Sequence, residues 1–187
     1  MVYRGGVEKV DGRTLRREEN RSAVLDALCD LYAEGVYDPS VAEIAARAGL
    51  SPRSLFRYFD DVDDLNRAAI ERMIDGARHL LDLDVDPAAP LAERIDRLVA
   101  ARLKVYDHIA PAARAIRIGA HRHPVLAKQL KHGRAFFRAQ VEQAFAIEGS
   151  TLDAVDALLQ FETYDLLPRA RAAAVLTDAL TKLLESR

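Results

Sequence analysis

The sequence holds little cysteine, tryptophan, glycine or proline, and each shortage excludes a class of protein. Cys29 is the single cysteine and there is no tryptophan. An intrachain disulfide framework is therefore excluded, and a reducing, cytoplasmic setting is expected. We interpret Cys29 as a core residue because leucines flank it at helical spacing. Only 9 glycines and 7 prolines among 187 residues, with abundant Ala, Leu, Arg and Glu, favour an all-α protein.

Patterns for membrane insertion, secretion and catalysis are also missing. No run of eighteen apolar residues occurs, so we expect no membrane contact, and the first residues lack the apolar core of a signal peptide. There is no GxSxG, no Gly-rich phosphate loop, no HExxH and no histidine set with metal-ligand spacing. We therefore predict that the chain is not an enzyme and has no catalytic residues, metal site or cofactor.

The most informative pattern is residues 40–59, SVAEIAARAGLSPRSLFRYF. Ser40 and Glu43 form a capping box that predicts the start of a helix. Gly49 can adopt the positive φ that ends this helix, and Ser51 caps a second one. Two short helices joined by a tight turn are the arrangement that places a helix in the major groove of DNA.

The second helix, over residues 52–58, is short, basic and aromatic. Leu55 and Phe59 are expected to face inward, which leaves Arg53, Ser54, Arg57 and Tyr58 to point outward toward phosphates and base edges. The alternative is a helix-turn-helix that serves only packing within a helical ligand-binding or enzymatic domain. The predicted DNA-contacting residues are Ser40, Ser51, Pro52, Arg53, Ser54, Phe56, Arg57 and Tyr58.

This run resembles the DNA-binding domain of TetR-type transcriptional regulators, with their AEIAxxAGxSxxxLxxxF spine. The resemblance covers roughly residues 17 to 78, and the body that follows is similar in architecture only. It implies a three-helix helix-turn-helix domain followed by a helical bundle that binds a small effector and forms a homodimer. It also implies a repressor of a near-palindromic operator in double-stranded DNA. The matching residues are Ala42, Glu43, Ile44, Ala45, Ala48, Gly49, Ser51, Leu55 and Phe59.

Two positions depart from the family pattern. Many relatives have a lysine near position 62 that reaches phosphate, whereas this chain has Val62 among four aspartates. Position 56 is often a tyrosine that contacts the DNA backbone, and Phe56 has no hydroxyl. The resemblance therefore implies weaker phosphate contacts than in those relatives.

Turn residues and prolines divide the chain into segments. We predict an arm over 1–16, the DNA-binding domain over 17–78 and an effector-binding and dimerisation domain over 79–187. The aspartates at 61, 63 and 64 are expected to cap a long helix that bridges the two domains. The expected helices run over 17–34, 40–48, 52–58, 61–80, 90–109, 111–122, 124–147, 151–167 and 169–185.

The stretch from His108 to Val141 contains no Asp or Glu but many basic residues. One interpretation is a surface for an acidic partner or anionic ligand. The other is a solvated basic face that acidic helices nearby balance. Both interpretations remain open from the sequence.

The effector is expected among the helices of residues 90–167 and should be largely apolar. Phe136 and Phe137 leave their helix about 100° apart, so one ring can face a cavity while the other packs in the core. Arg117 and His121 are the candidate polar groups, which would favour an acidic or carbonyl end. The predicted ligand-contacting residues are Tyr106, Arg117, His121, Phe136, Phe137, Phe161 and Tyr164.

The last two helices carry apolar stripes that predict the dimer contact. One stripe includes Leu159 and the other includes Leu180. A single chain that exposed both stripes would show more apolar surface than soluble proteins usually tolerate. We therefore expect two such helix pairs to meet about a two-fold axis.

Overall fold

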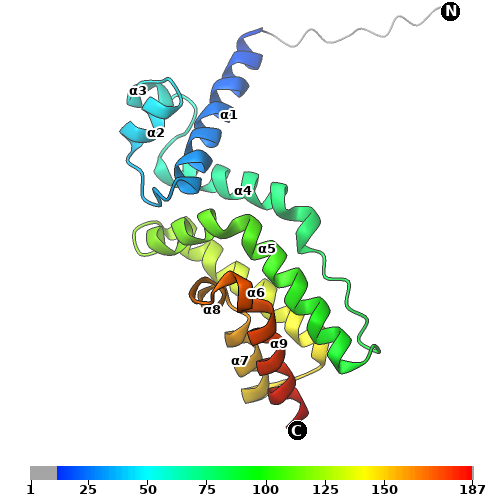
Figure 1. Cartoon of the computed structure of the whole chain (residues 1–187). Helices are drawn as coiled ribbons and strands as arrows, with labels where there is room; N and C mark the ends of the chain where they lie inside the picture. The colour runs from blue at the N-terminus through cyan, green and yellow to red at the C-terminus, as the bar shows by residue number, and fades with distance from the viewer. Residues whose placement is uncertain (1–11, 187) are drawn as a thin grey trace, which may run out of the picture.

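The computed structural model describes residues 12–186 and confirms an all-α fold over that range (Figure 1). Helices α1 to α4 form a head, and α5 to α9 form a body beneath it. The helices are α1 (Gly12–Ala33), α2 (Val41–Arg47), α3 (Pro52–Leu55), α4 (Val62–Leu81), α5 (Leu91–Gly119), α6 (Pro124–Phe145), α7 (Gly149–Leu158), α8 (Phe161–Leu166) and α9 (Arg169–Glu185).

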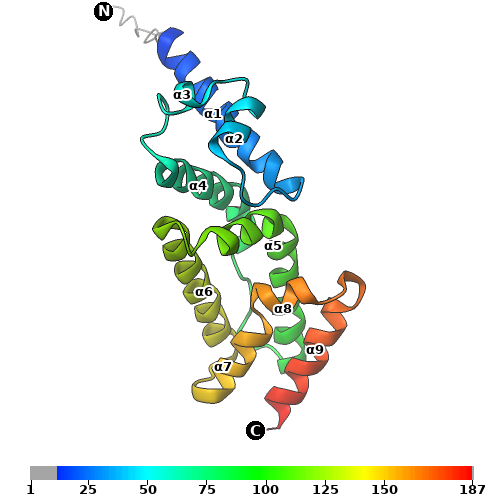
Figure 2. The ribbon, with the colours of Figure 1, turned by 90° about the vertical axis from the view of Figure 1, so that its left-hand side faces the viewer.

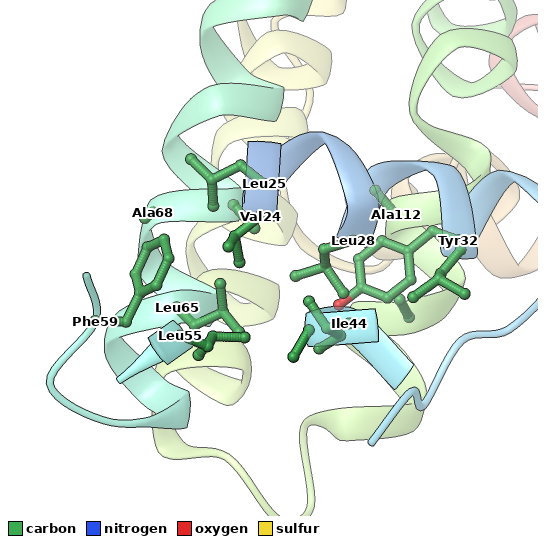
Figure 3. Packing of buried hydrophobic residues seen from close by; sticks show 14 residues of the cluster. Val24, Leu25, Leu28, Tyr32, Ile44, Leu55, Phe59, Leu65, Ala68 and Ala112 are labelled. Carbon is green, nitrogen blue, oxygen red and sulfur yellow. The ribbon is translucent and has the colours of Figure 1, made fainter. Parts of the chain in front are cut away.

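The head is held together by one apolar cluster between α1, α2, α3 and the first half of α4 (Figure 3). Leu28 of α1, Ile44 of α2 and Leu55 of α3 are almost fully buried in it. Ala112 and Ala115 of α5 belong to the same cluster. The body therefore contributes side chains to the core of the head, and the two parts pack as neighbours.

The first helix is longer than the sequence predicted. We expected an arm over 1–16 and a helix from Arg17, but α1 begins at Gly12. Residues 12–16 are polar or exposed and so give little apolar periodicity to signal a helix. The rest of the predicted arm lies outside the described residues.

Helix α5 runs without a break through Pro111, where the sequence predicted that one helix ends and another begins. A proline inside a helix removes one hydrogen bond and costs about 3 kcal/mol. Small buried residues on either side, Ala110, Ala112 and Ala113, pack against neighbouring helices here. This packing explains why the helix continues: tertiary contacts outweigh the local penalty.

The predicted helix over 151–167 is instead two helices, α7 and α8. The backbone of Gln160 is extended (φ −73°, ψ 156°) and separates them. This break turns Phe161 and Tyr164 inward, where each is nearly fully buried beside Tyr106. No glycine or proline marks the break. The packing of Phe161 and Tyr164 against Tyr106 accounts for it instead.

The body is organised around α5, which contacts α6, α8 and α9 (Figure 2). Leu159 and Leu180, which we expected on the dimer surface, are 1% and 0% exposed. They belong to a cluster that α5, α6, α7 and α9 share within one chain. The prediction that both apolar stripes face a second chain was therefore wrong, because most of their leucines fill the core.

Candidate nucleic-acid interface and internal cavity

Helix α3 is short and its position is set by local signals that the sequence predicted. The Ser51 side chain accepts a hydrogen bond from the Ser54 backbone N–H, and Pro52 occupies the first turn. Gly49 before it has a φ of 69°, which ends α2 and reverses the chain. Regular helix ends at Leu55, and turn hydrogen bonds continue the coil to Phe59. The predicted helix over 52–58 is therefore one α-helical turn followed by tighter turns.

Two arginines on α3 and the turn after it face solvent. Arg53 and Arg57 are both exposed, and neither side chain has a hydrogen-bond or ion-pair partner among residues 12–186. Phe56 lies between them and is 45% exposed, which is unusual for a phenylalanine. This face therefore presents two free cations and one ring outside the head core.

The remaining hydroxyl groups of the predicted contact set already have partners. Ser40 accepts from the Glu43 backbone N–H, and its own N–H donates to the Glu43 carboxylate at 2.8 Å, which confirms the capping box. Ser54 and Tyr58, which we expected to point outward, are half-buried. The Tyr58 hydroxyl accepts from Asn20 Nδ2 at 3.0 Å. Tyr58 is thus a link between α3 and α1 as well as a candidate contact.

The aspartates around Val62 have structural roles at the start of α4. Asp61 caps the helix by accepting from the Asp64 N–H at 2.7 Å, and Asp64 accepts from the Asp60 N–H at 3.2 Å. Asp63 pairs with His123 at 3.0 Å. These contacts explain why aspartates occupy positions from which they would repel phosphate. They stabilise the start of α4.

A cavity of about 380 Å³ that opens toward solvent lies between α4, α5, α6 and α8. Its walls are mainly aliphatic and aromatic, with a few polar groups, as in small-molecule sites. The lining residues are Ile70, Met73, Ile74, Ala77, Leu81, Tyr106, Ile109, Ala112, Ala113, Ile116, Arg117, Gln129, Leu130, His132, Gly133, Arg134, Phe136, Phe137, Gln160 and Phe161.

Most of the residues predicted to contact a ligand line this cavity, but two do not. His121 is exposed beyond the end of α5. The expected alignment of His121 with Arg117 fails because the helix ends at Gly119. Tyr164 packs behind Tyr106, and its hydroxyl donates to Asp107 at 2.7 Å. The cavity wall does contain Tyr106, Arg117, Phe136, Phe137 and Phe161.

Arg117 is not a free cation in the cavity. Its Nε donates to Glu162 at 3.0 Å, and its guanidinium lies 4.4 Å from the Phe161 ring centroid. Arg134 donates to the same carboxylate at 2.6 Å. Partial burial would raise the pKa of Glu162, but hydrogen bonds from the two arginines outweigh it and lower the pKa to about 2. Glu162 therefore stays ionised and offsets the charge of Arg117.

The acid-free stretch over 108–141 is balanced by acids from elsewhere in the chain. Arg114 pairs with Asp165 at 2.6 Å, and Arg138 pairs with Asp153 at 2.7 Å. Arg122 pairs with Asp38 in the head. The interpretation of a basic face balanced by nearby acids therefore accounts for these arginines.

Sequence reasoning missed the contribution of α4 to the cavity. Ile70, Met73, Ile74, Ala77 and Leu81 all line it. Their spacing is helical, and this signal was available, but we assigned this helix to the head and its link to the body. The same helix thus packs against α2 and α3 at one end and lines the cavity at the other.

Other kinds of site find no support in residues 12–186. No group of three His, Cys, Asp or Glu side chains within this range could hold a metal ion. No helix in the same range is long and apolar enough to span a bilayer. Burial raises the pKa of the half-buried Cys29 thiol, which disfavours the reactive thiolate.

Comparisons with known proteins agree with this geometry. Residues 24–69 match the family model of bacterial regulatory proteins, tetR family. No curated protein sequence is significantly similar. Among solved structures, the fold is similar to a tetR-family transcriptional regulator from Streptomyces coelicolor, with a TM-score of 0.67 and 20% identity over 90% of this chain and 82% of that one.

Two further crystal structures contain small molecules. One is the multidrug binding protein EbrR complexed with imidazole, with a TM-score of 0.65 and 20% identity over 88% of this chain and 94% of that one. The other is the TetR-like transcriptional regulator LfrR from Mycobacterium smegmatis in complex with proflavine, with a TM-score of 0.51 and 23% identity over 89% and 96% of the two chains. At these identities the likeness shows a shared fold.

Proposed function

We propose that the chain is a TetR-type one-component repressor that a small molecule releases from DNA, since residues 24–69 match the tetR family model. It would bind a near-palindromic operator as a homodimer. Two copies of α3 would enter successive major grooves about one helical turn apart. This assignment makes the protein a regulator rather than an enzyme.

The observation that carries the proposal is the pair of unpartnered cations on α3 and the turn after it. Arg53 and Arg57 are exposed, while Leu55 between them is fully buried and fixes the helix on the head. A unit that served only packing would have no need for two free arginines and an exposed Phe56 on its outer face. Arginines presented on a rigid helix suit guanine edges and phosphates.

We propose a division into a DNA-binding head over 17–78 and an effector-binding and dimerisation body over 79–187. Helix α4 belongs to both, since Leu65 is in the head core and Leu81 lines the cavity. A molecule in the cavity would therefore contact α4, the helix that also packs in the head core. The cavity is lined mainly by apolar residues, which supports a largely apolar effector.

We propose that the homodimer forms through the outer faces of α8 and α9. Leu166 is 84% exposed and Val175 is 42% exposed, although both are large aliphatic residues. Three alanines around them, Ala170, Ala173 and Ala174, are also exposed and would allow close approach of a second helix pair. This face replaces the buried leucine stripes that the sequence suggested.

A gel-shift and footprinting experiment on the DNA upstream of the protein's own gene tests the proposed function. The protein should protect a near-palindromic site, with two half-sites about one turn apart. Absence of retardation even at low salt would favour a helix-turn-helix with a packing role alone.

A further inference from the structure

Arg102 of α5 is a buried cation without a counter-ion. The residue is only 2% exposed, and its Nη1 atom has no hydrogen-bond partner. Among residues 12–186, no carboxylate lies within ion-pair distance of its guanidinium. Burial of an unpaired charge is costly, so such a residue calls for an explanation beyond packing.

The existing contacts of Arg102 are all with neutral groups. Nη2 donates to the Phe137 carbonyl and to Gln140 Oε1, each at 3.2 Å. The guanidinium also lies 4.1 Å from the centroid of the Phe137 ring. The two hydrogen bonds are comparatively long for a charged donor, and although the aromatic rings attract the cation, no contact supplies a negative charge.

Arg102 lies directly behind a wall of the cavity. Phe137, whose ring covers the guanidinium, also lines the cavity. Leu81 lines both the cavity and a small adjoining hollow beside Arg102. A rotation of the Phe137 ring would therefore uncover the guanidinium toward a molecule in the cavity.

The other arginines of the cavity wall differ from Arg102 in their pairing. Arg117 and Arg134 share the carboxylate of Glu162. Arg94, on the same helix as Arg102, also has an unpartnered nitrogen and lies over a ring, but it does not line the cavity. Arg102 alone in this comparison combines an uncompensated charge with proximity to the cavity.

We infer that Arg102 is the anion-binding residue of the cavity and that the effector is an apolar molecule that carries one carboxylate. This inference rests on the proposed function, because it names the ligand class of the same cavity. The carboxylate would supply the counter-charge and the missing acceptor for Nη1, while the apolar part fills the space between α4 and α6. It replaces the earlier expectation that Arg117 and His121 hold the acidic end.

Engagement of Arg102 would also affect α4. Gln140 accepts from Arg102 and donates through Nε2 to the carbonyl of Leu81 at 2.8 Å. Leu81 is the last residue of α4. A carboxylate that draws the guanidinium toward the cavity would break the Arg102–Gln140 bond and leave the end of α4 less constrained.

The test compares decanoate with decanol, which share an apolar chain and differ in charge. Isothermal titration measures the binding of each to the wild-type chain, to Arg102→Met and to the matched control Arg94→Met. Methionine is apolar and of similar length, and replacing a buried charge in this way is often neutral for stability. Thermal melting of each variant checks that it is folded.

We expect decanoate to bind the wild type at least about tenfold more tightly than decanol, because a charge-assisted hydrogen bond to a buried guanidinium is strong. Arg102→Met should bind the two equally, and Arg94→Met should keep the wild-type preference. Equal binding by the wild type, no binding of decanoate, or a preference that survives in Arg102→Met would overturn the inference. Operator binding by the ligand-free wild type, measured separately by gel shift, tests the proposed function itself.

Discussion

His123 Nδ1 lies 3.0 Å from Asp63 Oδ1, and this contact joins the start of α6 to the first turn of α4. The neighbouring Arg122 pairs with Asp38, in the turn between α1 and α2. The connection between α5 and α6 therefore touches the head at two points. Because α5 and α6 also line the cavity, a change there has a direct route to the head.

Replacement of His123 and Asp63 should show that their contact stabilises the folded state. A double-mutant cycle with His123→Ala and Asp63→Ala should give a coupling of roughly 0.5 kcal/mol in the free energy of unfolding, since the pair is only partly shielded from water. The exposed pair Arg78 and Asp75 serves as a control and should give a smaller coupling. Additive losses at His123 and Asp63 would mean that the contact has no role in joining head and body.

The head could be predicted from the sequence because its signals are local. Ser40 with Glu43, Gly49 and Ser51 with Pro52 each determine backbone geometry within a few residues, and the structure confirms all of them. The two inward residues Leu55 and Phe59 are also buried as expected.

The body was predicted less well because its features depend on contacts between distant segments. Pro111 signals a helix end locally, but packing carries α5 through it. The break at Gln160 has no local signal, since it depends on where Tyr106 lies. No local pattern distinguishes Arg102 in the sequence, and only the fold shows that α6 covers it.

Glu162→Gln should lower stability much more at neutral pH than in strong acid. The folded-state pKa of Glu162 is about 2, below its usual value of 4.5, so its contribution is present above pH 4.5 and is lost as the pH falls toward 2. Urea unfolding at pH 7 and near pH 2.5 measures this difference. An equal deficit of the variant at both pH values would contradict the assigned pKa.

Charged residues on the outer face of α8 and α9 should produce monomers. The double variant Leu166→Glu with Val175→Glu places two charges where we propose that a second chain packs. Sedimentation should show a monomer with weakened operator binding. Ile118→Glu, at a residue that is 43% exposed on α5, is the control and should remain dimeric. A dimeric double variant would place the interface elsewhere.

Val62→Lys should strengthen DNA binding without altering sequence preference. The side chain is half-buried at the first position of α4, where relatives often place a cation near phosphate. The salt dependence of binding should steepen by about one counterion per protomer. The melting temperature should fall slightly, because a cation opposes the helix dipole there. A gain on one operator alone would indicate base contacts instead.

The central claim is that Arg53 of α3 and Arg57 of the turn after it read DNA, and fluorescence anisotropy with labelled operator tests it most directly. The double variant Arg53→Ala with Arg57→Ala should lose specific binding, with about 1–3 kcal/mol from each base-directed arginine. Its circular dichroism and dimerisation should match the wild type, since neither side chain has a partner among residues 12–186. Arg78→Ala, an exposed arginine of α4 paired with Asp75, should bind normally. If the double variant binds the operator with wild-type affinity and salt dependence, α3 is not the helix that reads DNA.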